Sequence, residues 1–170
     1  STFDARFEAL KDLHLHTAVS WDLTPPGSMK TIYIMLIITG VGGQGNVLAS
    51  KLIGDILAAQ GYYVTIGETF GASQRGGSVM SHLRASTQGD LSPQIPKGQA
   101  HLVISLEPTE ALRVLKDYGS EEARVLCNLR PIHAISVISG EAEYPKIEQL
   151  QEWITALSQK AWFFNDTDAA

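Results

Sequence analysis

Apolar and polar positions along this chain follow first a strand pattern and then a helix pattern. The apolar run 32–38 is too short for a helix and rich in β-branched residues, which is typical of a buried strand. Residues 46–60 then show helical spacing, with one apolar face expected to pack on a sheet. Gly61 is suited to end this helix, because glycine adopts a positive φ without strain. The expected apolar face consists of Leu48, Leu52, Ile53, Ile56 and Leu57.

The same alternation predicts further elements up to the end of the chain. Residues 76–84 alternate apolar with polar side chains, as a half-exposed strand does. A helix is expected from Pro108 to just before Gly119, since proline fits the first helical turn. Another helix starts at Pro145, with Ile147, Leu150, Trp153, Ile154 and Leu157 facing inward. The remaining predictions are strands at 62–66, 101–106, 123–128, 134–138 and 161–164, and a loop at 88–98.

Strands that alternate with helices imply right-handed crossovers and a largely parallel sheet. We therefore expect an α/β fold of three layers, a mostly parallel sheet with helices on both faces and a Rossmann-like glycine loop after the first strand. Residues 30–170 are expected to form this domain. A truncated C-terminal end is one interpretation of where the sequence stops. The polar segment 1–29 is expected to be an arm, a linker or a remnant of a cloning junction, because it ends in Gly27-Ser28-Met29.

Composition and charge narrow the classes of function. The chain has 170 residues, of which 44% are hydrophobic and 18% charged, as in one globular domain. Its net charge of −5 and its scattered Lys and Arg residues argue against nucleic-acid binding. No apolar run reaches the roughly 20 residues of a membrane-spanning helix, and no signal peptide opens the chain, so a cytoplasmic location is expected. The single Cys127 excludes an internal disulfide and any cluster held by several thiolates of this chain.

The glycine-rich turn after the first strand is the main candidate site. Gly40, Gly42 and Gly45 have the spacing G-x-G-x-x-G, and Glu68 follows roughly 20 residues later, where a ribose-binding acid is expected. Backbone N–H groups at the start of the following helix attract anions, and the side chains of Gln44 and Asn46 can add hydrogen bonds there. Three hypotheses remain open: an NAD or FAD site of Rossmann type, a site for another anion, and glycines that serve packing alone.

Several single residues are weaker candidates. Arg75 offers a planar fork of donors for a carboxylate or phosphate, but it equally suits a structural ion pair. Glu107 is expected to cap the helix that starts at Pro108. His82 could transfer protons near Arg75, although a single histidine in a strand is more often structural. Residues 12–17, with His14 and His16, resemble the first metal motif of PHP-type phosphoesterases, yet the later ligand clusters are missing, so no working metal site is expected.

Three sequence blocks together resemble a known family. They are GVGGQGN at 40–46, ETFGASQRGGSVMSHLR at 68–84 and AHLVISLEPTEALR at 100–113, and they occur in family order. This combination resembles the gamma-type domain of 2-oxoacid:ferredoxin oxidoreductases, most closely that of the smaller subunit of the indolepyruvate type. The segment 1–28 has no counterpart in that pattern, and relatives usually continue beyond the position of Ala170.

The resemblance implies an activity that is shared with a partner. Such enzymes decarboxylate a 2-oxoacid on thiamine diphosphate, pass electrons through [4Fe–4S] clusters to ferredoxin and form an acyl-coenzyme A; arylpyruvates are the substrates of the indolepyruvate type. The cofactors belong to the larger alpha subunit, so this chain is expected to be inactive alone. Catalytic residues are not assigned. The positions expected to bind an anionic group or the partner are Gly40, Gly42, Gly43, Gln44, Gly45, Arg75, Gly76 and Gly77.

Overall fold

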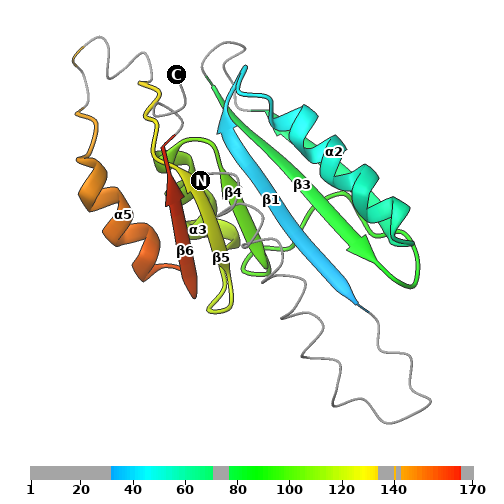
Figure 1. Cartoon of the computed structure of the whole chain (residues 1–170). Coiled ribbons are helices and arrows are strands. Elements are labelled where there is room, and N and C mark those ends of the chain that lie inside the picture. Colours follow the sequence, from blue (N-terminus) through cyan, green and yellow to red (C-terminus); the bar gives the residue numbers. More distant parts are fainter. Residues whose placement is uncertain (1–31, 71–76, 134–139, 141–142, 166–170) are drawn as a thin grey trace.

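A six-stranded sheet with helices on both faces forms the body of the protein (Figure 1). The computed structural model describes residues 32–70, 77–133, 140 and 143–165, and this part has the expected α/β class. The strands are β1 (Tyr33–Val41), β2 (Tyr63–Phe70), β3 (Ser78–Ser86), β4 (Leu102–Ser105), β5 (Arg124–Asn128) and β6 (Lys160–Phe164). The helices are α2 (Asn46–Ala59), α3 (Pro108–Tyr118) and α5 (Ile147–Ala156).

The sheet is mixed, which corrects part of the expectation of a mostly parallel sheet. Its strand order is β2-β3-β1-β4-β5-β6, and the pairs β1–β4, β4–β5 and β5–β6 are parallel. Strand β3 runs antiparallel to both of its neighbours, β2 and β1. The reason is the connection 71–77, which is shorter than the dozen or more residues that a parallel crossover needs. After so short a connection, β3 has to pair antiparallel with β2.

Two apolar cores lie on opposite faces of the sheet. Successive residues of β1 alternate between them: Leu36 and Ile38 pack on the side of α2, whereas Ile37 packs on the side of α3. The three side chains are at most 2% exposed, as expected for a central strand. Each such buried aliphatic side chain contributes about 1.5–3 kcal/mol to the hydrophobic stabilisation of the fold.

The predicted inward face of α2 is wrong for three of its five residues. Leu48, Leu52 and Ile56 are 63%, 54% and 58% exposed, and only Ile53 and Leu57 of the predicted face pack on the sheet. The buried residues of this helix are instead Asn46, Ser50 and Gly54. The physical reason is close approach: a Cβ on Gly54 would lie 3.0 Å from Ile66 Cδ1 of β2, so the small residues let the helix lie near the sheet.

Strand β3 is also more buried than its alternating pattern suggests, because both of its faces are covered. All residues from Met80 to Ser86 are buried. Helix α2 packs over one face. On the other face, the Arg84 guanidinium donates to the carbonyls of Ser92 and Gln94, and His82 Nδ1 accepts from Ile95 N at 3.1 Å. The segment around Ile95 therefore buries polar residues of β3 that the alternating pattern places at the surface.

The other predicted elements agree with the structure to within a few residues, with two exceptions in α5. Leu150 and Ile154 are buried as expected, but Trp153 and Leu157 are 41% and 51% exposed. Gly61 has the expected positive φ of 92°. The predicted strand 134–138 and the segment 1–29 lie outside the described residues.

Two glycine-to-alanine substitutions test the packing against the sheet. At Gly67, a Cβ would lie 2.7 Å from the Pro93 carbonyl oxygen, so the backbone has to shift; we expect Gly67→Ala to lose about 1–3 kcal/mol of unfolding free energy. At Gly54 the nearest atom is the flexible end of Ile66, and alanine favours the helix by about 1 kcal/mol. Gly54→Ala should therefore stay within about 1 kcal/mol of wild type in urea unfolding. Equal losses in both variants would contradict this packing.

A second prediction concerns acid stability. His82 is fully buried, its ring meets Tyr118 edge to face at 5.1 Å, and burial together with the Arg84 charge lowers its pKa. The unfolded state therefore binds a proton more readily than the folded state, and stability should fall as the pH drops below about 6.5. Burial lowers the pKa of His101 as well, so this residue acts in the same direction.

The variant His82→Asn removes one of these two titrations. Its melting temperature should fall less steeply than that of wild type between about pH 6.5 and pH 5, whatever its absolute stability. Parallel curves for the two proteins would show that His82 does not contribute to acid sensitivity.

Candidate functional site

The carboxyl ends of β1 and β4 lie side by side at the centre of the sheet. The two strands are parallel neighbours, with Thr39 opposite Ser105. The chain leaves β1 toward α2 on one face and leaves β4 toward α3 on the other. Such a switch in direction is where α/β sheets generally bind ligands.

Gln44 bridges the two loops that follow these strands. Its Oε1 accepts from Val41 N at 2.7 Å, and its Nε2 donates to the Leu106 carbonyl at 3.0 Å. The amide fills the space beside Gly40, because a Cβ there would lie 2.6 Å from Gln44 Oε1. Gly40 and Gln44 thus have a packing role at this point, and the crevice between the loops is spanned by protein atoms.

The exposed part of the loop keeps backbone donors available. Gly43 and Gly45 have φ of 93° and 89°, a conformation that strains other residues, and a Cβ on either would meet no atom within 4 Å. The first backbone bond at the start of α2 runs from Ala49 N to Gly45 O, so the N–H groups of the three preceding residues have no intrahelical partner. This end of the helix favours an anion.

The second glycine segment lies directly beside this loop. Gly42 N donates to Gly77 O at 2.9 Å, and Val41 is paired with Ser78. The structure therefore brings together Gly40, Gly42, Gly43, Gln44, Gly45 and Gly77 from the predicted site. Arg75 and Gly76 lie outside the described residues.

The geometry does not match a Rossmann dinucleotide site. In that fold the ribose-binding acid follows the strand next to β1, but here β3 separates β1 from β2, which carries Glu68. Glu68 is exposed on this outer strand. Gln44 in addition occupies the space next to Gly40. An NAD or FAD site at this loop would therefore lack both the ribose-binding acid and an open crevice.

A polar cluster beside the loop was not predicted. Glu110 Oε2 accepts from Ser78 Oγ at 2.5 Å and pairs with Arg113 at 2.8 Å, while Thr39 Oγ1 donates to Val79 O at 3.2 Å. The side chain of Glu110 is 14% exposed, whereas that of Arg113 is 42% exposed and can reach an incoming group. These residues come from β1, β3 and α3, so no local sequence pattern connects them.

Asn46 fastens the start of α2 to the same region. It is 4% exposed, and its Nδ2 donates to the Val79 carbonyl at 3.1 Å. The side chains of Gln44 and Asn46 thus bond to the protein's own backbone. They fix the start of the helix, and their part in binding an anion stays a prediction.

Glu107 has the capping role that the sequence predicts. Its Oε2 accepts from Glu110 N at 3.0 Å and from Thr109 Oγ1 at 2.5 Å. Its Oε1 accepts from the Tyr144 hydroxyl in a short hydrogen bond. Burial and this bond raise the pKa of Tyr144 far above its ordinary value, which keeps the hydroxyl protonated as a donor. The fully buried carboxylate thus ties the segment before α5 to the end of β4.

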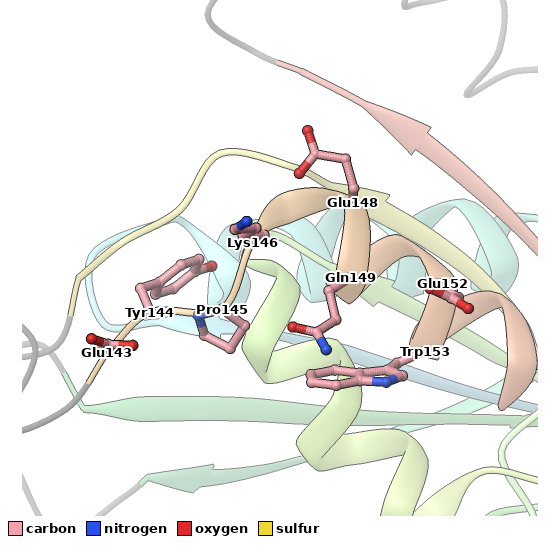
Figure 2. Close-up of a pocket in the computed structure, with 8 residues that line it drawn as sticks. All are labelled: Glu143, Tyr144, Pro145, Lys146, Glu148, Gln149, Glu152 and Trp153. Atoms are coloured by element: carbon pink, nitrogen blue, oxygen red, sulfur yellow. The ribbon is translucent and has the colours of Figure 1, made fainter.

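An open groove of about 760 Å³ lies at the start of α5, and no residue of the glycine loop lines it. Figure 2 shows Tyr144 and Pro145 at one end and Trp153 at the other. Three carboxylates line the groove, and Lys146 is its one cation. Since a surface of this charge repels anions, the groove does not suit an acidic substrate. The carboxylates are those of Glu143, Glu148 and Glu152.

The described residues offer no ligands for a metal or an iron–sulfur cluster. No group of three or more His, Cys, Asp or Glu side chains within them is placed to hold a metal ion. Burial, together with the Glu107 carboxylate, raises the pKa of Cys127 to about 12, which makes its thiol a poor ligand. The motif at 12–17 lies outside the described residues. None of the described helices is long and apolar enough to cross a bilayer.

Comparison with curated proteins identifies several relatives. The indolepyruvate oxidoreductase subunit IorB of Pyrococcus horikoshii is 41% identical over 118 residues, which cover 68% of this chain and 56% of that protein. The subunit of the same name from Methanothermobacter thermautotrophicus is 32% identical over 136 residues, covering 79% of this chain and 67% of that protein. The chain thus spans little more than half the length of relatives such as the Pyrococcus protein.

Solved structures and a family model lead to the same group. The pyruvate oxidoreductase subunit PORC of Thermotoga maritima superposes with a TM-score of 0.53 at 16% identity, over 80% of this chain and 64% of that chain. The 2-oxoglutarate:ferredoxin oxidoreductase of Magnetococcus marinus, solved with 2-oxoglutarate, coenzyme A and succinyl-CoA, gives 0.51 at 18% identity, over 69% of this chain and 19% of that chain. The model of the pyruvate ferredoxin/flavodoxin oxidoreductase family matches residues 35–164. This chain belongs to the pyruvate ferredoxin/flavodoxin oxidoreductase family.

Proposed function

We propose that this chain is the smaller subunit of a 2-oxoacid:ferredoxin oxidoreductase that acts on indolepyruvate and related arylpyruvates. In this proposal the complex decarboxylates the 2-oxoacid, transfers the acyl group to coenzyme A and reduces ferredoxin in the cytoplasm. The observation that carries the proposal is the similarity to IorB subunits at 32–41% identity over 68–79% of this chain, together with the family match over residues 35–164.

The division of work between subunits follows from the chemistry of this chain. Decarboxylation needs thiamine diphosphate, and electron transfer needs [4Fe–4S] clusters bound through several thiolates. With one cysteine in the whole sequence, which is buried, the chain cannot supply such a ligand set. The clusters are therefore proposed to lie on a larger alpha subunit, which the family resemblance implies also binds thiamine diphosphate.

The glycine loop is proposed to receive an anionic group of the assembled enzyme. Its exposed backbone and the start of α2 favour negative charge, and Arg113 lies across Glu110 from Ser78, next to Gly77. Arg75, separated from Gly77 by one residue, is proposed as a further donor. Coenzyme A phosphates, the 2-oxoacid carboxylate and the partner's cofactor all present suitable oxygen atoms.

Reconstitution tests the proposed function. The chain and the larger subunit from the same organism should be purified anaerobically, separately and after co-expression, and assayed for viologen reduction with an arylpyruvate and coenzyme A. We expect iron–sulfur absorption and activity only when the larger subunit is present, with full activity only in the complex. Pyruvate and 2-oxoglutarate serve as alternative substrates. Turnover by the chain alone, or a complex that prefers these alternative substrates, would argue against the proposal.

A charge at Gly43 tests the anion site within that complex. The position has open space around it, so Gly43→Asp places a carboxylate at the positive end of α2. We expect the KM of the group bound there, coenzyme A or the 2-oxoacid, to rise about threefold to tenfold, with kcat less affected.

Gly43→Asn is the matched control, because asparagine has nearly the same shape and the same positive-φ strain without the charge. Its KM values should stay near those of wild type. If the two variants behave alike, strain in the loop rather than its electrostatics is responsible.

A further inference from the structure

One side of α2 presents several large apolar residues to solvent. Lys51 and Asp55, the only charged residues of the helix, are exposed as well and have opposite signs. We call this surface the outer face of α2. Its large apolar residues are Val47, Leu48, Leu52 and Ile56, which are 47%, 63%, 54% and 58% exposed.

This arrangement departs from the usual amphipathic order. Apart from Ile53 and Leu57, the helix turns small or polar residues toward the sheet and leaves its other large aliphatic residues outside. Single exposed apolar side chains are ordinary, but Leu48, Leu52 and Ile56 follow one another at intervals of four residues and form a continuous ridge. Contiguous apolar surface that is poor in charge is typical of the buried centre of a protein interface.

The outer face continues directly into the glycine loop. Val47 and Leu48 belong to the outer face, and their backbone N–H groups belong to the anion-attracting start of the helix. A partner that covers the ridge therefore also reaches the loop. The partner and the bound anion have to meet at this end of α2.

A second copy of this chain fits the outer face less well. A helix of 14 residues is about 21 Å long, and one side of it provides only part of the roughly 800 Å² per partner of a stable interface. An antiparallel pair of α2 helices centred on Leu52 would also set the copy's helix end against the loop. A larger partner can extend beyond the helix and bring its own ligand to the loop.

We propose that the outer face of α2 is the docking surface for the larger, cofactor-carrying subunit, which contacts it through an uncharged apolar surface. This inference rests on the proposed function and specifies where the two subunits join. Helix α2 then has two roles: its start faces the anion, and its side holds the subunit that delivers it.

The test uses the co-expressed complex and the double variant Leu52→Glu/Ile56→Glu. Both positions are exposed and glutamate is a good helix former, so the fold should be retained. We expect the amount of larger subunit that co-purifies with the tagged chain to fall at least tenfold, with an unchanged circular dichroism spectrum. The conservative double variant Leu52→Met/Ile56→Leu should retain the partner.

Leu157→Glu is the matched control on the other side of the sheet. Leu157 is 51% exposed at the end of α5, so the substitution adds one glutamate, half the charge of the double variant, at similar exposure. We expect it to leave the complex intact. Loss of the partner with Leu157→Glu but not with the α2 variant would place the interface on α5 and overturn the inference.

The remaining outcomes separate the inference from the proposed function. If the wild-type complex is active and the α2 variant binds as well as wild type, the inference fails and the function stands. If the chain alone forms a dimer that the α2 variant abolishes, the outer face belongs to a second copy. If the larger subunit does not co-purify with the tagged wild-type chain and the sample shows no activity, the proposed function fails as well.

Discussion

The side-chain amide of Gln44 joins the two central parallel strands where both end, and the region around the site is built on this contact. It holds the loop after β1 against the loop after β4 through Val41 N and the Leu106 carbonyl. A Cβ on Gly40 would lie 2.6 Å from Gln44 Oε1, so a larger residue there would displace the amide. The G-x-G-x-x-G spacing therefore serves packing in part, and the exposed end of the loop, Gly43 to Gly45, leaves backbone to face a ligand.

The sequence predicts the elements of this fold well and their environment less well. The runs that form β1 and β4 are almost wholly apolar, and β5 has an apolar centre, so burial in a sheet suits all three strands. The direction of β3 was predictable in principle, because the connection 71–77 is too short for a crossover. Its burial was not, since it depends on Arg84 and His82 binding a segment some ten residues further along the chain.

The candidate site was predictable in its glycines but not in its polar contacts. Motif spacing identified both glycine segments, and Gly42 does bond to Gly77. Periodicity says nothing about the cluster around Glu110, since its members lie on three elements, and Thr39 and Glu110 are 71 residues apart. The dinucleotide hypothesis failed for a related reason: spacing places Glu68 at the correct distance along the chain, whereas the sheet order inserts β3 between it and β1.

The error on α2 is the most informative one. A hydrophobic periodicity identifies the apolar side of a helix, and the assumption that this side faces the chain's own core holds only when the chain is the whole folding unit. Here the small residues around Gly54 let the helix lie close to β2, while the ridge of Leu48, Leu52 and Ile56 remains outside. Both sides of the helix are thus suited to packing, one against its own sheet and the other against a further protein surface. The described residues include no group of side chains that could hold a metal ion, so in the proposed function this domain would act on the chemistry by binding, and such a surface is suited to that.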